Sequence, residues 1–93
     1  MLAAEVVELP HGARMSARIS DVSPTGCYID TLNPVPKNSK VRLRITHRDE
    51  VFEALGRVVY VSPGLGMGVT FEGVAPEQLD RLVRWLGETD REF

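Results

Sequence analysis

Apolar and polar residues alternate along several short stretches of the chain, and a period of two residues is typical of β-strands that bury one face. The most regular stretch is KVRLRIT, residues 40–46, in which Val41, Leu43 and Ile45 fall on one face. Lysine, arginine and threonine occupy the other face of the same stretch. We therefore expect a strand here with an aliphatic inner side and a basic outer side.

The stretch RMSARISDV, residues 14–22, alternates in the same way but contains an irregularity. Apolar residues fall on odd positions as far as Ile19, whereas Val22 is apolar at an even position. One extra residue in a strand, a β-bulge, shifts the alternation by one position. We predict such a bulge near Ser20–Asp21, with Cys27 pointing inward again after the turn that follows.

Proline and glycine clusters separate the alternating stretches. Proline fixes φ and glycine permits positive φ, so PHG at 10–12, NPVPKNS at 33–39 and SPGLG at 62–66 are expected to be turns or connections. A polar tip, HRDE at 47–50, joins two of the strands. The strands are expected at about 2–9, 14–22, from Cys27 onward, 40–46, 51–61 with a bend at Gly56, and 67–71.

An amphipathic helix is expected near the end of the chain. Pro76 suits the first helical position, where no backbone donor is needed, and Gly87 suits the stop after the last turn. The helix is therefore predicted over about 76–87, with 88–93 as a flexible tail. Beside its apolar stripe, Trp85 either completes the core or extends an exposed apolar patch. The stripe, spaced i, i+3, i+4 and i+7, consists of Leu79, Leu82, Val83 and Leu86.

The order of these elements predicts the fold class. A sheet of six strands with one apolar face tends to curl and close, because closure removes the exposed edges. We therefore predict an all-β fold with one C-terminal helix, a closed six-stranded antiparallel barrel formed as a single domain over residues 1–93. The helix would cover one open side or end of the barrel.

Composition narrows the classes of function. Of the 93 residues, 43% are hydrophobic and 26% are charged, which is typical of one soluble globular domain. A net charge of −2 argues against nucleic-acid binding, which depends on clustered lysine and arginine. The single cysteine excludes an internal disulfide framework and fits a reducing cytoplasm. No apolar run is long enough to cross a bilayer and no basic leader precedes one, so we expect a cytoplasmic protein without membrane insertion.

The stretch DVSPTGCYI, residues 21–29, places an acid, a hydroxyl and a glycine at fixed offsets between two strands. Asp21 and Ser23 are two residues apart, so in an extended chain they face the same side. Gly26 can adopt a left-handed conformation, which a Cβ would penalise. Such residues often bond to nearby backbone amides and cap a turn, and these six residues alone favour that role over ligand binding.

The pattern Asp21-x-Ser23-x-x-Gly26 resembles the second signature motif of PilZ domains, [D/N]-x-S-x-x-G. The flanking PHGARMSARISDVSPTGCYI is similar to that family's first hairpin, and GLGMGVTFEGV is similar to its late G-x-G-V-x-F strand. The resemblance implies a PilZ-like six-stranded barrel that acts as a receptor for the bacterial messenger cyclic di-GMP. It further implies that Asp21 accepts hydrogen bonds from a guanine edge, that Ser23 bonds to the base or a phosphate, and that Gly26 keeps the backbone open to the ligand.

The other PilZ motif, R-x-x-x-R, is not found at its usual place in a loop before the first strand. A match that the chain does contain, Arg14 to Arg18, lies inside the predicted strand 14–22, with its arginines about 13 Å apart at ~3.3 Å per residue. We interpret both as the solvated face of that strand. A few hydrogen bonds from Asp21 and Ser23 net ~1 kcal/mol each, whereas micromolar affinity requires about −8 kcal/mol.

Two functions therefore stay open. The first is a non-catalytic regulatory module of cyclic di-GMP signalling that binds the nucleotide at the D-x-S-x-x-G turn. The alternative is a divergent PilZ domain that does not bind the nucleotide and acts as a protein–protein interaction module in motility, pilus or exopolysaccharide control. Both readings imply a protein partner. Neither needs a cofactor, and no paired catalytic groups point to an enzyme.

The remaining candidate residues have ordinary structural explanations. His11 and His47 lack the spacing of a metal site, and Cys27 is read as a small core residue. The glycines of GLGMG, residues 64–68, are read as turn and packing residues, since no helix follows at once. A basic stripe is either a solvated or edge-protecting strand face or a contact surface for an acidic partner or a phosphate. This stripe consists of Lys40, Arg42, Arg44 and Arg48.

Overall fold

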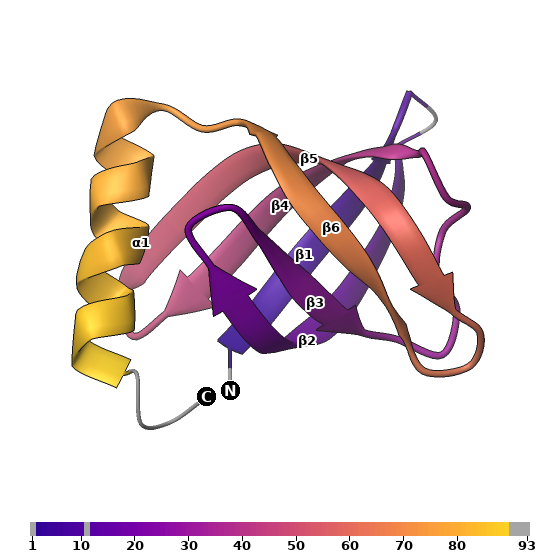
Figure 1. Cartoon of the computed structure of the whole chain (residues 1–93), viewed down its shortest axis with the longest axis horizontal. Helices are drawn as coiled ribbons and strands as arrows, with labels where there is room; N and C mark the ends of the chain where they lie inside the picture. Colours follow the sequence, from indigo (N-terminus) through magenta and orange to yellow (C-terminus); the bar gives the residue numbers. More distant parts are fainter. Residues whose placement is uncertain (1, 11, 90–93) are drawn as a thin grey trace.

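A computed structural model describes residues 2–10 and 12–89 and confirms the predicted fold class (Figure 1). Six antiparallel strands close into a barrel in the order β1-β2-β3-β6-β5-β4, so each strand pairs on both sides. One helix, α1, follows the last strand and stands across one end of the barrel (Figure 1). The elements are β1 (Leu2–Leu9), β2 (Ala13–Ser23), β3 (Gly26–Asp30), β4 (Lys40–His47), β5 (Glu50–Ser62), β6 (Gly66–Gly73) and α1 (Pro76–Thr89).

The barrel interior is filled by the residues that the alternation placed inside. Val41, Leu43 and Ile45 of β4 are completely buried, while the basic residues between them are exposed. Burying one aliphatic side chain of this size contributes about 1.5–3 kcal/mol, so this interior face supplies much of the driving force for closure. The largest fully buried side chains are Trp85, Phe52, Ile19, Ile29, Leu43, Ile45, Met67 and Leu82.

The predicted bulge in β2 is confirmed. The register between β2 and β3 shifts after Ile19, so that Asp21 pairs with Tyr28 and Ser20 is the extra residue. As a result, Val22 is buried and the residues on either side of it are exposed. The bulge thus turns the end of β2 so that Asp21 and Ser23 face solvent together.

The buried stripe of α1 differs from the prediction at one position. Leu82 and Trp85 are buried at 0% and 1% exposure, whereas Val83 is 51% exposed. Successive helical residues are rotated by about 100°, and the tryptophan ring shifts the buried face toward Leu82 and away from Val83. Trp85 therefore completes the core, which was one of the two roles left open for it.

The predicted helix stop at Gly87 is also wrong. A glycine ends a helix when it adopts a positive φ, and Gly87 does not. The helix therefore continues to Thr89. Residues 90–93, which the prediction assigned to a flexible tail, lie outside the described part of the chain. Within residues 2–10 and 12–89, no helix is long and apolar enough to cross a bilayer.

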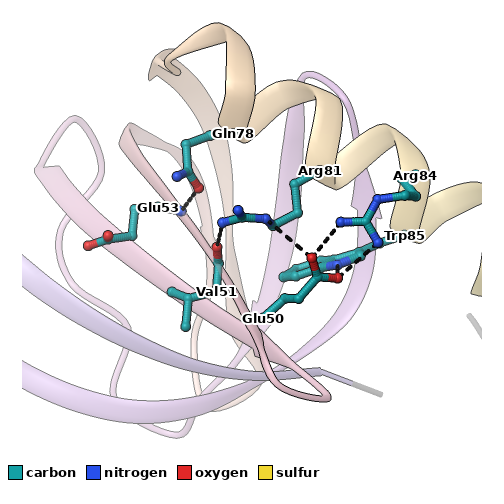
Figure 2. A network of polar contacts seen from close by, with 7 residues as sticks. All are labelled: Glu50, Val51, Glu53, Gln78, Arg81, Arg84 and Trp85. Carbon is teal, nitrogen blue, oxygen red and sulfur yellow. Dashed lines mark hydrogen bonds and ion pairs between the residues drawn. The ribbon is translucent and has the colours of Figure 1, made fainter.

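A polar cluster at the start of β5 attaches α1 to the barrel (Figure 2). The Glu50 carboxylate accepts hydrogen bonds from Arg84 Nη1 at 2.9 Å and from Trp85 Nε1 at 3.0 Å. Arg81 Nε lies 3.6 Å from the same carboxylate, and Arg81 Nη1 donates to the carbonyl of Val51. These contacts, led by the hydrogen bond from Arg84, lower the pKa of Glu50 to about 2.

Glu50 is expected to make stability depend on pH. Its pKa of about 2 in the folded protein lies below the usual value of about 4.3 in an unfolded chain. The unfolded state therefore binds more protons, and this contribution is complete above about pH 5 and is lost as the pH falls toward 2. We expect denaturant unfolding of Glu50→Gln to show a shallower loss of stability across that window.

The matched control is Glu5→Gln, which alters a carboxylate with one long, exposed contact to Arg14 at 3.4 Å. This control should keep the wild-type dependence on pH. An unchanged slope in Glu50→Gln would show that the cluster does not couple protonation to folding.

Candidate functional site

A row of directly paired residues crosses four strands on the outside of the barrel. Asp21 of β2 pairs with Tyr28 of β3, Tyr28 pairs with Gly68 of β6, and Gly68 pairs with Tyr60 of β5. These residues, together with Ser23, line an open pocket of about 210 Å³. The strand order thus brings residues that are spread over a 48-residue span of the sequence, from Asp21 to Gly68, to one surface.

Two tyrosine rings form the apolar part of this pocket. The ring centroids of Tyr28 and Tyr60 are 6.0 Å apart, with the planes tilted by 32°. Gly68 lies between their backbones, and a Cβ there would overlap the Tyr60 ring. Gly68 is therefore a packing residue, as the sequence predicted for this segment. Tyr60 remains 50% exposed, so part of its ring is available to a ligand.

Asp21 is free to accept hydrogen bonds from a ligand. Its side chain is exposed at the rim of the pocket. Within the part of the chain that the structure describes, no donor forms a hydrogen bond or ion pair with its carboxylate. The role of capping the turn, which the sequence favoured for these residues, therefore does not apply to Asp21.

Ser23 does perform that capping role. Its hydroxyl oxygen accepts a hydrogen bond from the backbone N–H of Thr25 at 3.3 Å, and it lies 3.1 Å from Thr25 Oγ1. The hydroxyl also lies 3.4 Å from the carbonyl oxygen of Gly26, to which it can donate. Ser23 therefore stiffens the turn beside Asp21, and its side chain stays exposed at the pocket.

The reason for glycine at position 26 differs from the prediction. Gly26 does not have a positive φ, so the left-handed conformation expected from the motif is absent at this residue. A Cβ there would instead overlap the backbone carbonyl oxygen of Val69 on β6. The glycine is required because β3 and β6 approach closely, and backbone atoms cannot move aside as a flexible side chain can.

Cys27 is a core residue, as predicted from its position. It is 8% exposed, and burial, followed by the negative charge of Asp21, raises the pKa of its thiol to about 12. The thiolate is the reactive form of cysteine, so this side chain is not a nucleophile near neutral pH.

Cations are missing from the pocket. None of its lining residues is lysine or arginine. Arg14 and Arg18 lie within β2 and are exposed, which agrees with the prediction that they form the solvated face of that strand. Arg18 instead lines a second hollow of about 540 Å³ beside Asp30 and Leu65.

The described residues contain no group of three histidine, cysteine, aspartate or glutamate side chains that could hold a metal ion. His11 lies outside those residues. The rings of His47 and Trp85 pack in a T-shaped arrangement, with centroids 5.3 Å apart.

The two tyrosines are the part of the site that the sequence reasoning did not find. Tyr28 lies within the motif stretch, but its partner Tyr60 is 32 residues away in the sequence. Only the strand order places them together, since β6 separates β3 from β5. The available signal was the small residue at position 68, which leaves room for a ring on the outer face.

Comparison with known proteins gives a consistent result. The family model for the PilZ domain matches residues 2–88. The crystal structure of the PilZ domain of CeSA from a cellulose-synthesizing bacterium superimposes with a TM-score of 0.74 at 15% sequence identity. The match covers 96% of this chain and 92% of that one, and at this identity it shows the shared fold. No curated protein matches the chain.

Proposed function

This chain belongs to the PilZ domain family, and from that membership we propose that it is a cytoplasmic, non-catalytic regulatory module of cyclic di-GMP signalling. We further propose that the pocket at the Asp21–Gly26 turn receives one guanine of the nucleotide. The observation that carries this proposal is the free carboxylate of Asp21 in one row with two tyrosine rings.

The chemistry of the pocket suits a guanine. The base presents N–H donors along its Watson–Crick edge, and an ionised carboxylate accepts two such bonds at once. Base stacking on an aromatic side chain contributes about 1–3 kcal/mol, and the exposed ring of Tyr60 offers such a surface. Ser23 holds the turn in shape beside the acceptor.

The same pocket is poor at holding the two phosphates, because it has no cation and Asp21 is itself an anion. Two hydrogen bonds at ~1 kcal/mol each and one stacked base at 1–3 kcal/mol give about 3–5 kcal/mol. Micromolar affinity needs about 8 kcal/mol. We therefore expect this chain to bind cyclic di-GMP only weakly, with a dissociation constant above about 100 μM.

Two-dimensional NMR of the amide groups, with cyclic di-GMP added up to about 1 mM, tests the proposal. We expect chemical-shift changes only in amide groups around Asp21, Tyr28 and Tyr60. We expect Asp21→Ala to lower the affinity for the nucleotide by at least tenfold. The matched control is Asp49→Ala, an exposed acid in the β4–β5 turn, which should bind as the wild type does. Equal binding by Asp21→Ala would mean that the nucleotide sits elsewhere.

The second candidate is a PilZ domain that does not bind the nucleotide and acts only through a protein partner in motility, pilus or exopolysaccharide control. The absence of lysine and arginine among the pocket's lining residues favours it. A complete absence of shifts at 1 mM would select this candidate over the first.

A further inference from the structure

The basic residues of β4 need an explanation other than edge protection. Lys40, Arg42 and Arg44 are exposed along the outer face of this strand. Charged residues often protect the open edge of a sheet, but β4 pairs with β1 on one side and with β5 on the other. The edge-protecting role considered from the sequence is therefore wrong, because the barrel is closed, whereas the exposure of these side chains agrees with the solvated face considered beside it.

The strand register gathers a third arginine at the same place. Val7 of β1 pairs with Arg14 of β2 on one side and with Arg42 of β4 on the other. Arg44 lies two residues further along β4, on the same face. Together with Glu5 and Glu53, these residues line a hollow of about 200 Å³.

The cations of this hollow are available to a ligand. Neither Arg42 nor Arg44 forms a hydrogen bond or ion pair with any residue in the described part of the chain. Arg14 lies 3.4 Å from Glu5, with side-chain exposures of 70% and 47%. An exposed pair of this kind contributes about 0–1 kcal/mol and is easily exchanged for another partner. The cluster does not follow from a basic composition, since the whole chain carries a net charge of −2.

An apolar hollow adjoins the basic one. A space of about 320 Å³ shares Arg42 and Glu53 with it and continues along Leu55 and Ala75 to Glu77 and Gln78, at the beginning of α1. Leu55 is 42% exposed, so an aliphatic side chain of a partner could pack on it. The first hollow has one more arginine than glutamate, and the second adds an exposed aliphatic side chain. This combination matches a peptide with acidic and aliphatic residues better than it matches a free phosphate.

We propose that this surface, which we call the Arg42 groove (Arg14, Arg42, Arg44, Leu55 and Ala75), binds an acidic, leucine-bearing segment of a protein partner. Carboxylates of the segment would pair with the guanidinium groups, and an adjacent aliphatic side chain would pack on Leu55. The Arg42 groove lies on the outside of β2, β1, β4 and β5. The pocket that contains Asp21 and the two tyrosines lies across β2, β3, β6 and β5. The proposal goes beyond the nucleotide-binding role and does not rest on it.

Fluorescence polarisation with three labelled nonapeptides tests the proposal on the whole chain. The first probe repeats the unit Asp-Glu-Leu, the second replaces each leucine with glycine, and the third replaces each acid with lysine. We expect the first probe to bind at least fivefold more tightly than the second, no binding of the third, and weaker binding in higher salt. Binding of the glycine probe as tightly as the leucine probe would overturn the apolar half of the proposal.

Substitutions then locate the binding surface. We expect the double variant Arg42→Glu, Arg44→Glu to lose at least tenfold in affinity for the first probe, and Leu55→Ser to lose the advantage of the leucine probe. The control is Lys37→Glu, which reverses an exposed cation in the segment before β4, and it should bind as the wild type does. Equal losses in the control and the double variant would overturn the proposal, as would full competition by inorganic pyrophosphate at an equal concentration.

Discussion

Replacing Trp85 with alanine is expected to lower the free energy of unfolding by about 3–5 kcal/mol. The side chain is 1% exposed and packs edge-on against Phe52, with centroids 6.5 Å apart, and against His47. Its indole N–H also donates to Glu50, so the substitution removes one partner of the polar cluster that attaches α1 to β5. The loss combines a large cavity at the covered end of the barrel with a weakened attachment of the helix.

Unfolding in guanidinium chloride measures this effect, and Val83→Ala provides the control on the same helix. Val83 is 51% exposed, so its truncation should change stability by no more than about 0.5 kcal/mol. If Trp85→Ala cost less than about 1 kcal/mol, α1 would not be part of the core, and this end of the barrel would not depend on the helix for its stability.

An R-x-x-x-R segment attached before Leu2 is expected to tighten binding of cyclic di-GMP by at least tenfold. Leu2 pairs with Ile19, which lies next to the bulge that presents Asp21, so an added segment would leave the barrel beside the pocket. Hydrogen bonds from arginine to phosphate contribute about 1.5–3 kcal/mol each. Part of that gain is lost in ordering the segment, which is why we expect tenfold rather than the full effect.

The matched control for this experiment carries glutamine in place of both added arginines. It has the same length and can still donate hydrogen bonds, but it has no charge. We expect its affinity to stay within about twofold of the unextended chain. Equal gains in affinity from the two segments would mean that the added chain length, and not the arginine charges, tightens the binding of cyclic di-GMP.

The features that were predictable from the sequence are those with a local cause. The inward faces of β2 and β4 follow from alternation alone, because side chains in a strand point to opposite sides in turn. The bulge near Ser20–Asp21 could be found because one extra residue changes the parity of every residue after it. Closure of the barrel followed from the same pattern, since a sheet with one apolar face has edges to remove.

The features that were missed depend on residues far apart in the sequence. The need for glycine at position 26 comes from the carbonyl of Val69, which no local pattern contains. The pairing of Tyr28 with Tyr60 across Gly68 requires the order of β3, β6 and β5. Val83 is exposed because Trp85, on the neighbouring side of the helix, is the residue that packs into the barrel end. The periodic pattern alone does not tell which of these two sides of the helix is buried.

Calorimetric titration of cyclic di-GMP most directly tests whether Asp21 binds the guanine while a separate cationic segment binds the phosphates. The titration uses four proteins: the chain itself, the chain with the arginine segment, and Asp21→Ala in each. We expect the extended chain that retains Asp21 to bind at least tenfold more tightly than each of the other three proteins. A dissociation constant well below about 100 μM for the unextended chain would contradict this expectation, because the pocket would then hold the phosphates without a cation. Unchanged affinity of the extended chain after Asp21→Ala would contradict it as well, because the guanine would not be bound at this turn.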